Sequence, residues 1–194
     1  MSNEFKDWYN DMSEKQKKIY NICMEYPFLF PRDIDGTIDE DFEYEYLGLE
    51  IPSGWYKLFL QMCSDIKPIL KKENLMDGFY FIQVKEKYNR LTCYYTNNTP
   101  LAVKEIITKY EHMARYICSH CGKPATYETD DYILSFCDDC WKDYVRHLSV
   151  KQIEFKPYFT VNTATEGVHF DEKLISFEDE WNRYLKGFEN SEEK

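Results

Sequence analysis

The sequence contains two Cys-x2-Cys pairs separated by 15 residues: Cys118 and Cys121, then Cys137 and Cys140. A Cys-x2-Cys turn can direct two sulfur atoms at one ion about 2.3 Å away, and two such turns complete the tetrahedral shell of Zn²⁺. The gap between the pairs is typical of zinc sites of this kind. Because four sulfurs leave no position for a water molecule, the spacing predicts one structural Zn²⁺. His120 lies between the first two ligands, and we expect it to face solvent because four thiolates already suffice.

Composition and charge restrict the setting. The 194 residues are enough to bury a core, and an aromatic content of 18% excludes a disordered chain. The net charge of −11 opposes binding of the molecule as a whole to nucleic acid or anionic membrane. No apolar run is long enough to span a bilayer, and the N-terminus lacks the pattern of a signal peptide. Three further cysteines lie in apolar segments, as in proteins of a reducing compartment, so we expect a cytoplasmic protein.

The hydrophobic pattern of the first 70 residues predicts two helices. A capping box formed by Ser13 and Gln16 marks the start of the first helix. Apolar residues at helical spacing over 53–70 predict a second helix, with Ser53 as its cap. Pro68 should kink this helix or divide it. Between the two, alternation over 42–49 indicates a short strand.

The middle of the chain predicts a β-hairpin followed by a third helix. Residues 79–96 contain two β-rich runs around a polar turn in which Asn89 can take the left-handed conformation. Thr99 should cap the next helix, with Pro100 at its first position, and its apolar stripe leads into Cys118. The expected fold class is therefore α+β, a small antiparallel sheet or hairpin covered by helices.

The zinc module should contain its own small hairpin within 125–136 and a helix over 141–148. This arrangement is typical of the treble-clef class, and the alternative is a zinc ribbon, in which both cysteine pairs lie on hairpins. We expect an α+β core over 1–117 that includes the acidic segment 33–50, the zinc module over 118–148, and a C-terminal extension over 149–194. In the extension, 153–161 resembles a strand broken by Pro157, and Ser176 should cap a final helix.

The acidic segment 33–50 contains eight carboxylates and no Lys or Arg. Such runs are most often solvated loops. Part of the segment resembles a calcium loop, but the register fails at the first and last ligand positions. A third interpretation is a surface that imitates nucleic-acid phosphates and occupies a basic cleft of another protein. The candidate partner-binding residues are Asp33, Asp35, Asp39, Glu40, Asp41, Glu43 and Glu45.

Basic residues concentrate over 85–123, where seven stand against three acidic ones, a local net charge of +4. Basic residues beside a zinc module and aromatic strands are suited to phosphate contacts. The simpler interpretation is a mixed surface that complements the acidic half of the same molecule. If nucleic acid binds, we expect Lys85, Lys87 and Arg90 to contact it.

Residues for catalysis are sparse. The four histidines are scattered, and no hydrolase, phosphate-loop or dinucleotide-binding motif is present. With a closed metal shell and no second ligand set, the sequence predicts that the protein is not an enzyme.

Four segments in this order carry a resemblance: YPFLFPRD (26–33), IPSGWYKLF (51–59), IQVKEKYNRLTCYY (82–95) and CSHCGKPA (118–125). Through them, residues 26–140 resemble an uncharacterised family of proteins from bacteriophages and bacterial mobile elements. In that family glycine usually stands where this chain has Asn89, and the second cysteine pair is often altered, whereas both pairs are intact here. The resemblance implies a viral or prophage accessory protein in a bacterial cytoplasm, and no activity comes with it.

Two functions follow as hypotheses. The first is a non-enzymatic, zinc-containing phage-type accessory protein that binds a host bacterial protein and inhibits a defence or nucleic-acid-processing system. The alternative is a nucleic-acid-binding accessory factor that uses the basic face of 85–123. A virion or scaffold component is a third possibility.

Overall fold

The computed structural model describes residues 9–33, 35–39, 47–165 and 169–192. The α+β class is confirmed, because helices accompany small antiparallel sheets with strand orders β1-β2, β4-β3-β5 and β6-β7. Residues 42–46 of the strand expected over 42–49 lie outside the described part of the chain. The elements in chain order are α2 (Glu14–Glu25), α3 (Tyr56–Lys72), β1 (Phe81–Glu86), β2 (Leu91–Tyr95), α4 (Leu101–Met113), β3 (Tyr127–Thr129), β4 (Ser135–Phe136), α5 (Asp138–Cys140), β5 (Val150–Gln152), β6 (Tyr158–Thr165), β7 (His169–Ser176) and α6 (Glu178–Glu192).

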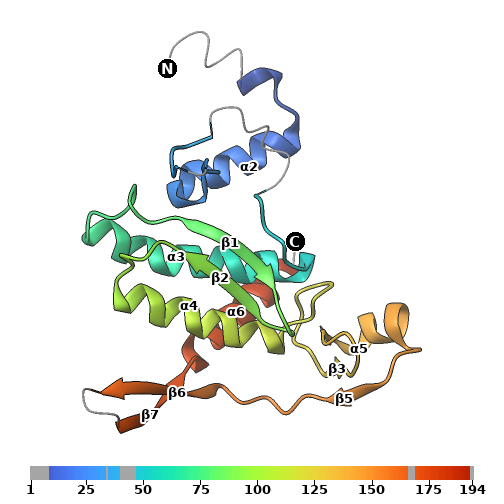
Figure 1. Ribbon diagram of the computed structural model, residues 1–194. Helices are drawn as coiled ribbons and strands as arrows, with labels where there is room; N and C mark the ends of the chain where they lie inside the picture. The colour runs from blue at the N-terminus through green and yellow to red at the C-terminus, as the bar shows by residue number, and fades with distance from the viewer. Residues whose placement is uncertain (1–8, 34, 40–46, 166–168, 193–194) are drawn as a thin grey trace.

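The main core lies between the β1–β2 hairpin and helices α3, α4 and α6 (Figure 1), and the buried side of α2 belongs to the same cluster. Trp55, Phe59 and Tyr110 are fully buried in it. Phe177 and Tyr184, at the start and in the middle of the C-terminal helical segment, belong to the same core. The segment 149–194, expected as an extension, therefore completes the hydrophobic core.

Among the expected helix caps, Ser13 is confirmed, Ser53 and Thr99 are wrong, and Ser176 Oγ accepts from the amide of Glu178, the first residue of α6. The capping box is present, because Ser13 Oγ accepts from the Gln16 amide and Gln16 Oε1 accepts from the Ser13 amide. Ser53 does not cap α3: its hydroxyl donates to the His120 carbonyl, and a 3-10 turn, Ser53–Trp55, precedes the helix. Thr99 does not cap α4, because its hydroxyl donates to the Thr96 carbonyl and Pro100 takes the N-cap position. Both hydroxyls therefore donate to carbonyl groups and do not accept from an amide in the first turn of the helix.

Helix α3 continues through Pro68, so the expected division of this helix is wrong. Proline removes one amide donor and leaves the carbonyl of Ser64 without its helical partner. Both Ser64 and Pro68 lie on the exposed side of the helix, where water can satisfy that carbonyl. The buried side, which includes Met62 and Ile66, therefore remains helical.

The central hairpin is confirmed. Strands β1 and β2 pair antiparallel, and the Lys87 amide donates to the Arg90 carbonyl across the turn. Asn89 has φ +59°, as expected, and Tyr88 has φ +52°. Two left-handed residues close this turn.

The C-terminal strands differ from the expected strand over 153–161. β5 ends at Gln152 and pairs with β3 of the zinc module, while β6 begins after Pro157 and pairs with β7. The chain therefore crosses from the zinc module to the β6–β7 hairpin, which lies along α4 (Figure 1). A third strand thus joins the zinc module from outside the range 118–148.

Candidate metal centre and cationic hollow

The four predicted ligands, Cys118, Cys121, Cys137 and Cys140, converge. Their Sγ atoms all lie within 4.8 Å of one another, and Cys121 Sγ is 3.6 Å from Cys137 Sγ. Four sulfurs placed tetrahedrally at about 2.3 Å from one ion are about 3.8 Å apart, so this set fits a single metal ion. Three of the four cysteines are buried, and only Cys121 is exposed.

The first pair lies on a tight turn that follows helix α4. The Cys118 amide donates to the Lys123 carbonyl, and the Gly122 amide donates back to the Cys118 carbonyl. Gly122 has φ +81°, a left-handed conformation that favours glycine. The turn therefore directs both sulfurs of the pair to the same side of the chain.

The thiols are arranged for a cation. Burial alone would raise the pKa of Cys118, but backbone amides of Cys121, Cys137 and His120 hydrogen-bond to it and lower this pKa below its usual value. Burial and the neighbouring Cys118 raise the pKa of Cys121 to about 11, and burial also raises the pKa of Cys140. Crowded thiols resist losing several protons in water, whereas a bound divalent ion deprotonates coordinating thiols outright.

The metal-binding turn is attached to the main core by close backbone contacts at the start of α3. The Gly54 amide donates to the Ser119 carbonyl at 2.9 Å, and Trp55 Nε1 donates to the Ile117 carbonyl at 3.2 Å. A Cβ on Gly54 would lie only 2.1 Å from the Cys118 carbonyl oxygen. Position 54 must therefore be glycine for the turn to approach this closely.

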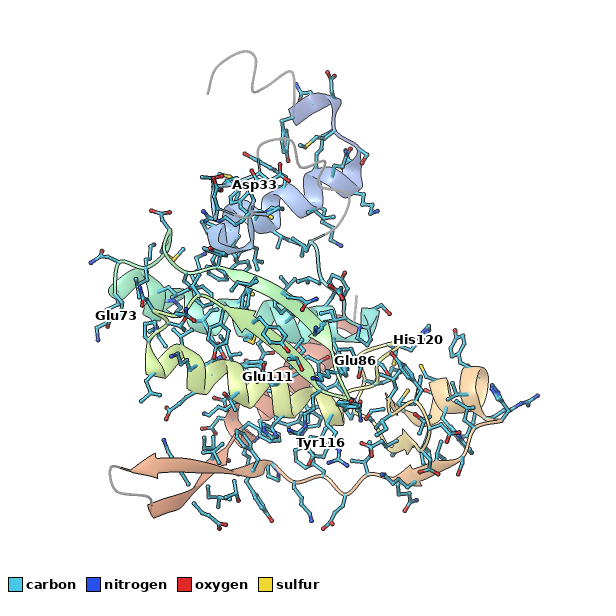
Figure 2. The ribbon with its side chains drawn as sticks, in the orientation of Figure 1. Asp33, Glu73, Glu86, Glu111, Tyr116 and His120 are labelled. Atoms are coloured by element: carbon cyan, nitrogen blue, oxygen red, sulfur yellow. The ribbon has the colours of Figure 1, made fainter. Side chains whose placement is uncertain are left out.

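The C-terminal helix holds the same turn from another direction. The Tyr184 hydroxyl, buried in α6, donates to the Gly122 carbonyl at 2.8 Å. His120 is exposed (Figure 2), and its ring centroid lies 4.3 Å from that of Tyr144. It is not part of the cysteine cluster, which agrees with its expected solvent-facing position.

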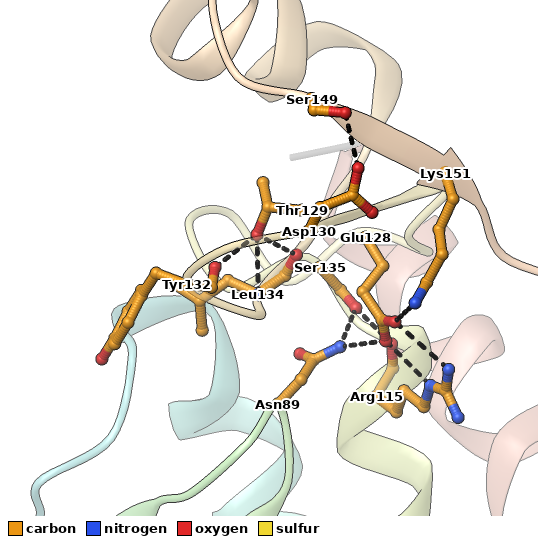
Figure 3. Close-up of polar contacts among 10 residues, drawn as sticks. All are labelled: Asn89, Arg115, Glu128, Thr129, Asp130, Tyr132, Leu134, Ser135, Ser149 and Lys151. Atoms are coloured by element: carbon orange, nitrogen blue, oxygen red, sulfur yellow. Dashed lines mark hydrogen bonds and ion pairs between the residues drawn. The ribbon is translucent and has the colours of Figure 1, made fainter.

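A buried carboxylate links the zinc module to the end of the β1–β2 hairpin (Figure 3). Glu128 on β3 is only 3% exposed, and it accepts from Asn89 Nδ2 at 2.9 Å. Arg115 donates to it through Nε at 2.9 Å, and Lys151 Nζ lies 2.9 Å away. Although burial raises the pKa of Glu128, these partners outweigh burial and lower it, so the carboxylate is ionised.

Four cationic side chains line a surface hollow of about 480 Å³ together with this carboxylate, and two of them, Arg115 and Lys151, contact it directly. Lys87 and Arg90 come from the hairpin turn, Arg115 from the end of the α4 segment, and Lys151 from β5. With Glu128 as the one acidic residue of the lining, the hollow carries a net charge of +3. Tyr88, Thr92 and Ile133 complete the lining.

Of the three basic residues expected to contact nucleic acid, Lys85 lies apart from Lys87 and Arg90. Lys85 is half-buried, donates to Gln83 at 2.8 Å and lies 5.2 Å from the Tyr94 ring centroid. It borders a different hollow, whose lining includes Glu50 and Glu86. Lys87 and Arg90 thus line one hollow with two further basic residues, Arg115 and Lys151, whereas Lys85 does not line it.

Only three of the seven acidic candidates can be placed. Asp33 and Asp35 are exposed, and the Asp35 carboxylate accepts from the amide and the hydroxyl of Thr37 in a local turn. Asp39 is half-buried. Figure 2 shows Asp33 in the N-terminal part, away from Glu86 at the end of β1. The remaining candidates, Glu40, Asp41, Glu43 and Glu45, lie outside the described residues.

Sequence reasoning missed Lys151 and Glu128 as parts of the hollow. Lys151 lies beyond the basic range 85–123 and reaches the hollow only because β5 pairs with β3.

None of the helices within the described ranges combines the length and apolar character that a membrane span requires. Comparison of the chain with protein-family models, curated proteins and solved structures finds no match.

Proposed function

We propose that the protein is a non-enzymatic accessory protein of phage type that binds nucleic acid at the cationic hollow. The observation that carries this proposal is the convergence of four cations from three separate elements on one surface. Basic side chains gathered beside exposed aromatic rings are the usual footprint of phosphate recognition.

In this proposal the metal is one Zn²⁺ with a structural role. A turn, a small hairpin and a helical segment that begins at the second cysteine pair support a treble-clef-like module, rather than a zinc ribbon. The four thiolates would leave the ion no site for substrate. The zinc fixes β3 and thereby Glu128, which in turn orients Arg115 and Lys151.

A non-enzymatic role is supported by the state of the other thiols. Burial raises the pKa of Cys23 to about 12 and raises the pKa values of Cys63 and Cys93 well above their usual range. The thiolate is the nucleophilic form, so burial disfavours the reactive state of these three thiols.

The net charge of −11 does not preclude this function. At physiological salt the Debye length is about 8 Å, so exposed charges farther away are largely screened. A phosphate in the hollow would respond mainly to the adjacent cations. Binding should still weaken steeply as salt concentration rises.

Fluorescence anisotropy with a labelled oligonucleotide tests the proposal. Glutamate at both Lys87 and Arg90 should abolish binding at about 50 mM salt. The matched control places glutamate at Lys71 and Lys72, which are exposed at the end of α3 and give the same change in net charge. If both double variants lose binding equally, net charge explains the loss, and the hollow is not the nucleic-acid site.

Binding to a host bacterial protein remains a second proposal, favoured by the exposed carboxylates of Asp33 and Asp35. Tagged protein would be used to capture partners from bacterial lysate. A partner retained by wild type and lost on Asp33→Asn with Asp35→Asn would support it. Capture that is unchanged by these substitutions would contradict the assigned surface.

A further inference from the structure

We infer that the cationic hollow holds a backbone phosphate of single-stranded nucleic acid while Tyr88 stacks on an adjacent base. The inference rests on the proposed function and specifies its ligand. It joins two observations: a preorganised set of cations around a buried carboxylate, and an exposed aromatic ring held in the adjoining turn.

The cations at the floor of the hollow are fixed in place. Two guanidinium nitrogens of Arg115, Nε and Nη2, donate to the two oxygens of Glu128 at 2.9 and 3.3 Å. Lys151 Nζ lies 2.9 Å from Glu128 Oε1, and Asn89 holds the same carboxylate from the hairpin turn. Glu128 therefore positions two cations, and its single charge is outweighed by theirs.

Arg90 is available to a ligand. Its side chain is exposed and lines the hollow, and its charge acts at longer range on the Glu111 carboxyl without a hydrogen bond or ion pair to a described residue. The pKa of the His112 imidazole is lowered to about 4 by burial and by the nearby charges of Arg90 and Arg115. Arg90 and Arg115 therefore lie close enough to act on the same imidazole, and Arg90 also acts on the nearby Glu111 carboxyl, whose pKa it lowers against the larger effect of burial.

Tyr88 has the properties of a stacking platform. Its side chain is 75% exposed, and Lys87 Nζ lies 5.8 Å from the ring centroid. Its φ of +52° is unfavourable for a bulky side chain, and little burial compensates for that conformation. The two-residue hairpin turn requires this conformation, and it leaves the ring exposed at the tip of the hairpin. Bases of a single strand can stack on such a ring, whereas duplex bases are already stacked on one another.

The experiment compares three labelled ligands of equal length: a single-stranded oligonucleotide, a duplex and an abasic single strand. Tyr88→Asn removes the ring while asparagine tolerates the left-handed turn. Its control is Tyr158→Asn, at an exposed tyrosine on β6. Arg90→Ala and Lys151→Gln remove phosphate contacts, with Lys71→Ala as their control. Zinc content and circular dichroism verify that each variant is folded.

We expect the single strand to bind about 10-fold more tightly than the abasic strand, and Tyr88→Asn to remove that difference. Arg90→Ala and Lys151→Gln should weaken binding of every ligand and reduce the salt slope by about 0.7 each for single strands. The control variants should bind like wild type.

Three negative outcomes are distinguishable. If wild type binds all three ligands equally and Tyr88→Asn has no effect, the single-strand inference is wrong and nucleic-acid binding stands. If no ligand binds wild type even at low salt, the proposed function fails, and the inference fails with it. If Tyr88→Asn weakens binding but Arg90→Ala and Lys151→Gln do not, the phosphate assignment of the hollow is wrong.

Discussion

Replacement of Gly54 by alanine should separate the metal-binding turn from the main core. The new Cβ would lie 2.1 Å from the Cys118 carbonyl oxygen and 2.6 Å from the Gly122 amide nitrogen. Both neighbours are backbone atoms, so no side-chain rotation can relieve the overlap. An acceptable carbon–oxygen contact is about 3.3 Å, so the turn must move by roughly 1 Å.

That movement disrupts three hydrogen bonds between the core and the turn. They join the Gly54 amide to Ser119, the Ser53 hydroxyl to His120 and the Trp55 indole to Ile117, at 2.9, 2.9 and 3.2 Å. Each such bond contributes about 1 kcal/mol to stability. Overpacking adds about 1–3 kcal/mol, so the free energy of unfolding should fall by about 4–6 kcal/mol.

Chemical denaturation measures this loss, and chelator competition measures the affinity for zinc in the same preparation. For a chain of this length the melting temperature should fall by at least about 8 °C. Gly78→Ala is the matched control, because its Cβ would meet only Leu75 Cδ2 at 3.7 Å, an ordinary contact. If Gly54→Ala melts and binds zinc like Gly78→Ala, the close backbone approach does not exist in solution and the reasoning is refuted.

Two other predictions concern the metal and pH. Cys137→Ser should lower bound zinc, measured by elemental analysis, from one equivalent to below about one tenth, because the tetrahedral shell loses a ligand; full retention of zinc would contradict the assigned shell. Burial raises the pKa of Glu111 from 4.5 to about 7, so the folded state binds more protons than the unfolded state between these values and stability falls as pH rises through this window. In the wild-type protein the Cys93 amide donates to Glu111 at 2.8 Å, and Glu111→Gln keeps an oxygen in place to accept this bond. The variant should be more stable than wild type by at most about 3 kcal/mol at pH 8. The difference in stability should vanish below about pH 4.5. Urea denaturation across this pH range would disprove the assignment if the difference between the two proteins did not change with pH.

Short-range patterns predicted the parts of the fold that depend on short-range forces. The capping box at Ser13 is correct because the two hydrogen bonds join residues only three apart. The left-handed Asn89 follows from the chemistry of a tight turn. Ser53 and Thr99 were misassigned as caps because each hydroxyl found a carbonyl outside the helix it precedes, at His120 and at Thr96. The tendency of serine and threonine to cap helices does not show whether a nearby carbonyl will accept from the same hydroxyl.

The sequence by itself identified the four cysteines that converge, since two residues between paired cysteines are enough to direct both sulfurs at one point. Only the tertiary structure decided what surrounds this cluster. Lys151 lines the same hollow as Arg90 because β5 pairs with β3, and Gly54 meets Cys118 because the turn before α3 packs against the Cys118–Cys121 turn. Strand partners and helix contacts are selected by burial of the whole core, a cooperative quantity that no short segment encodes.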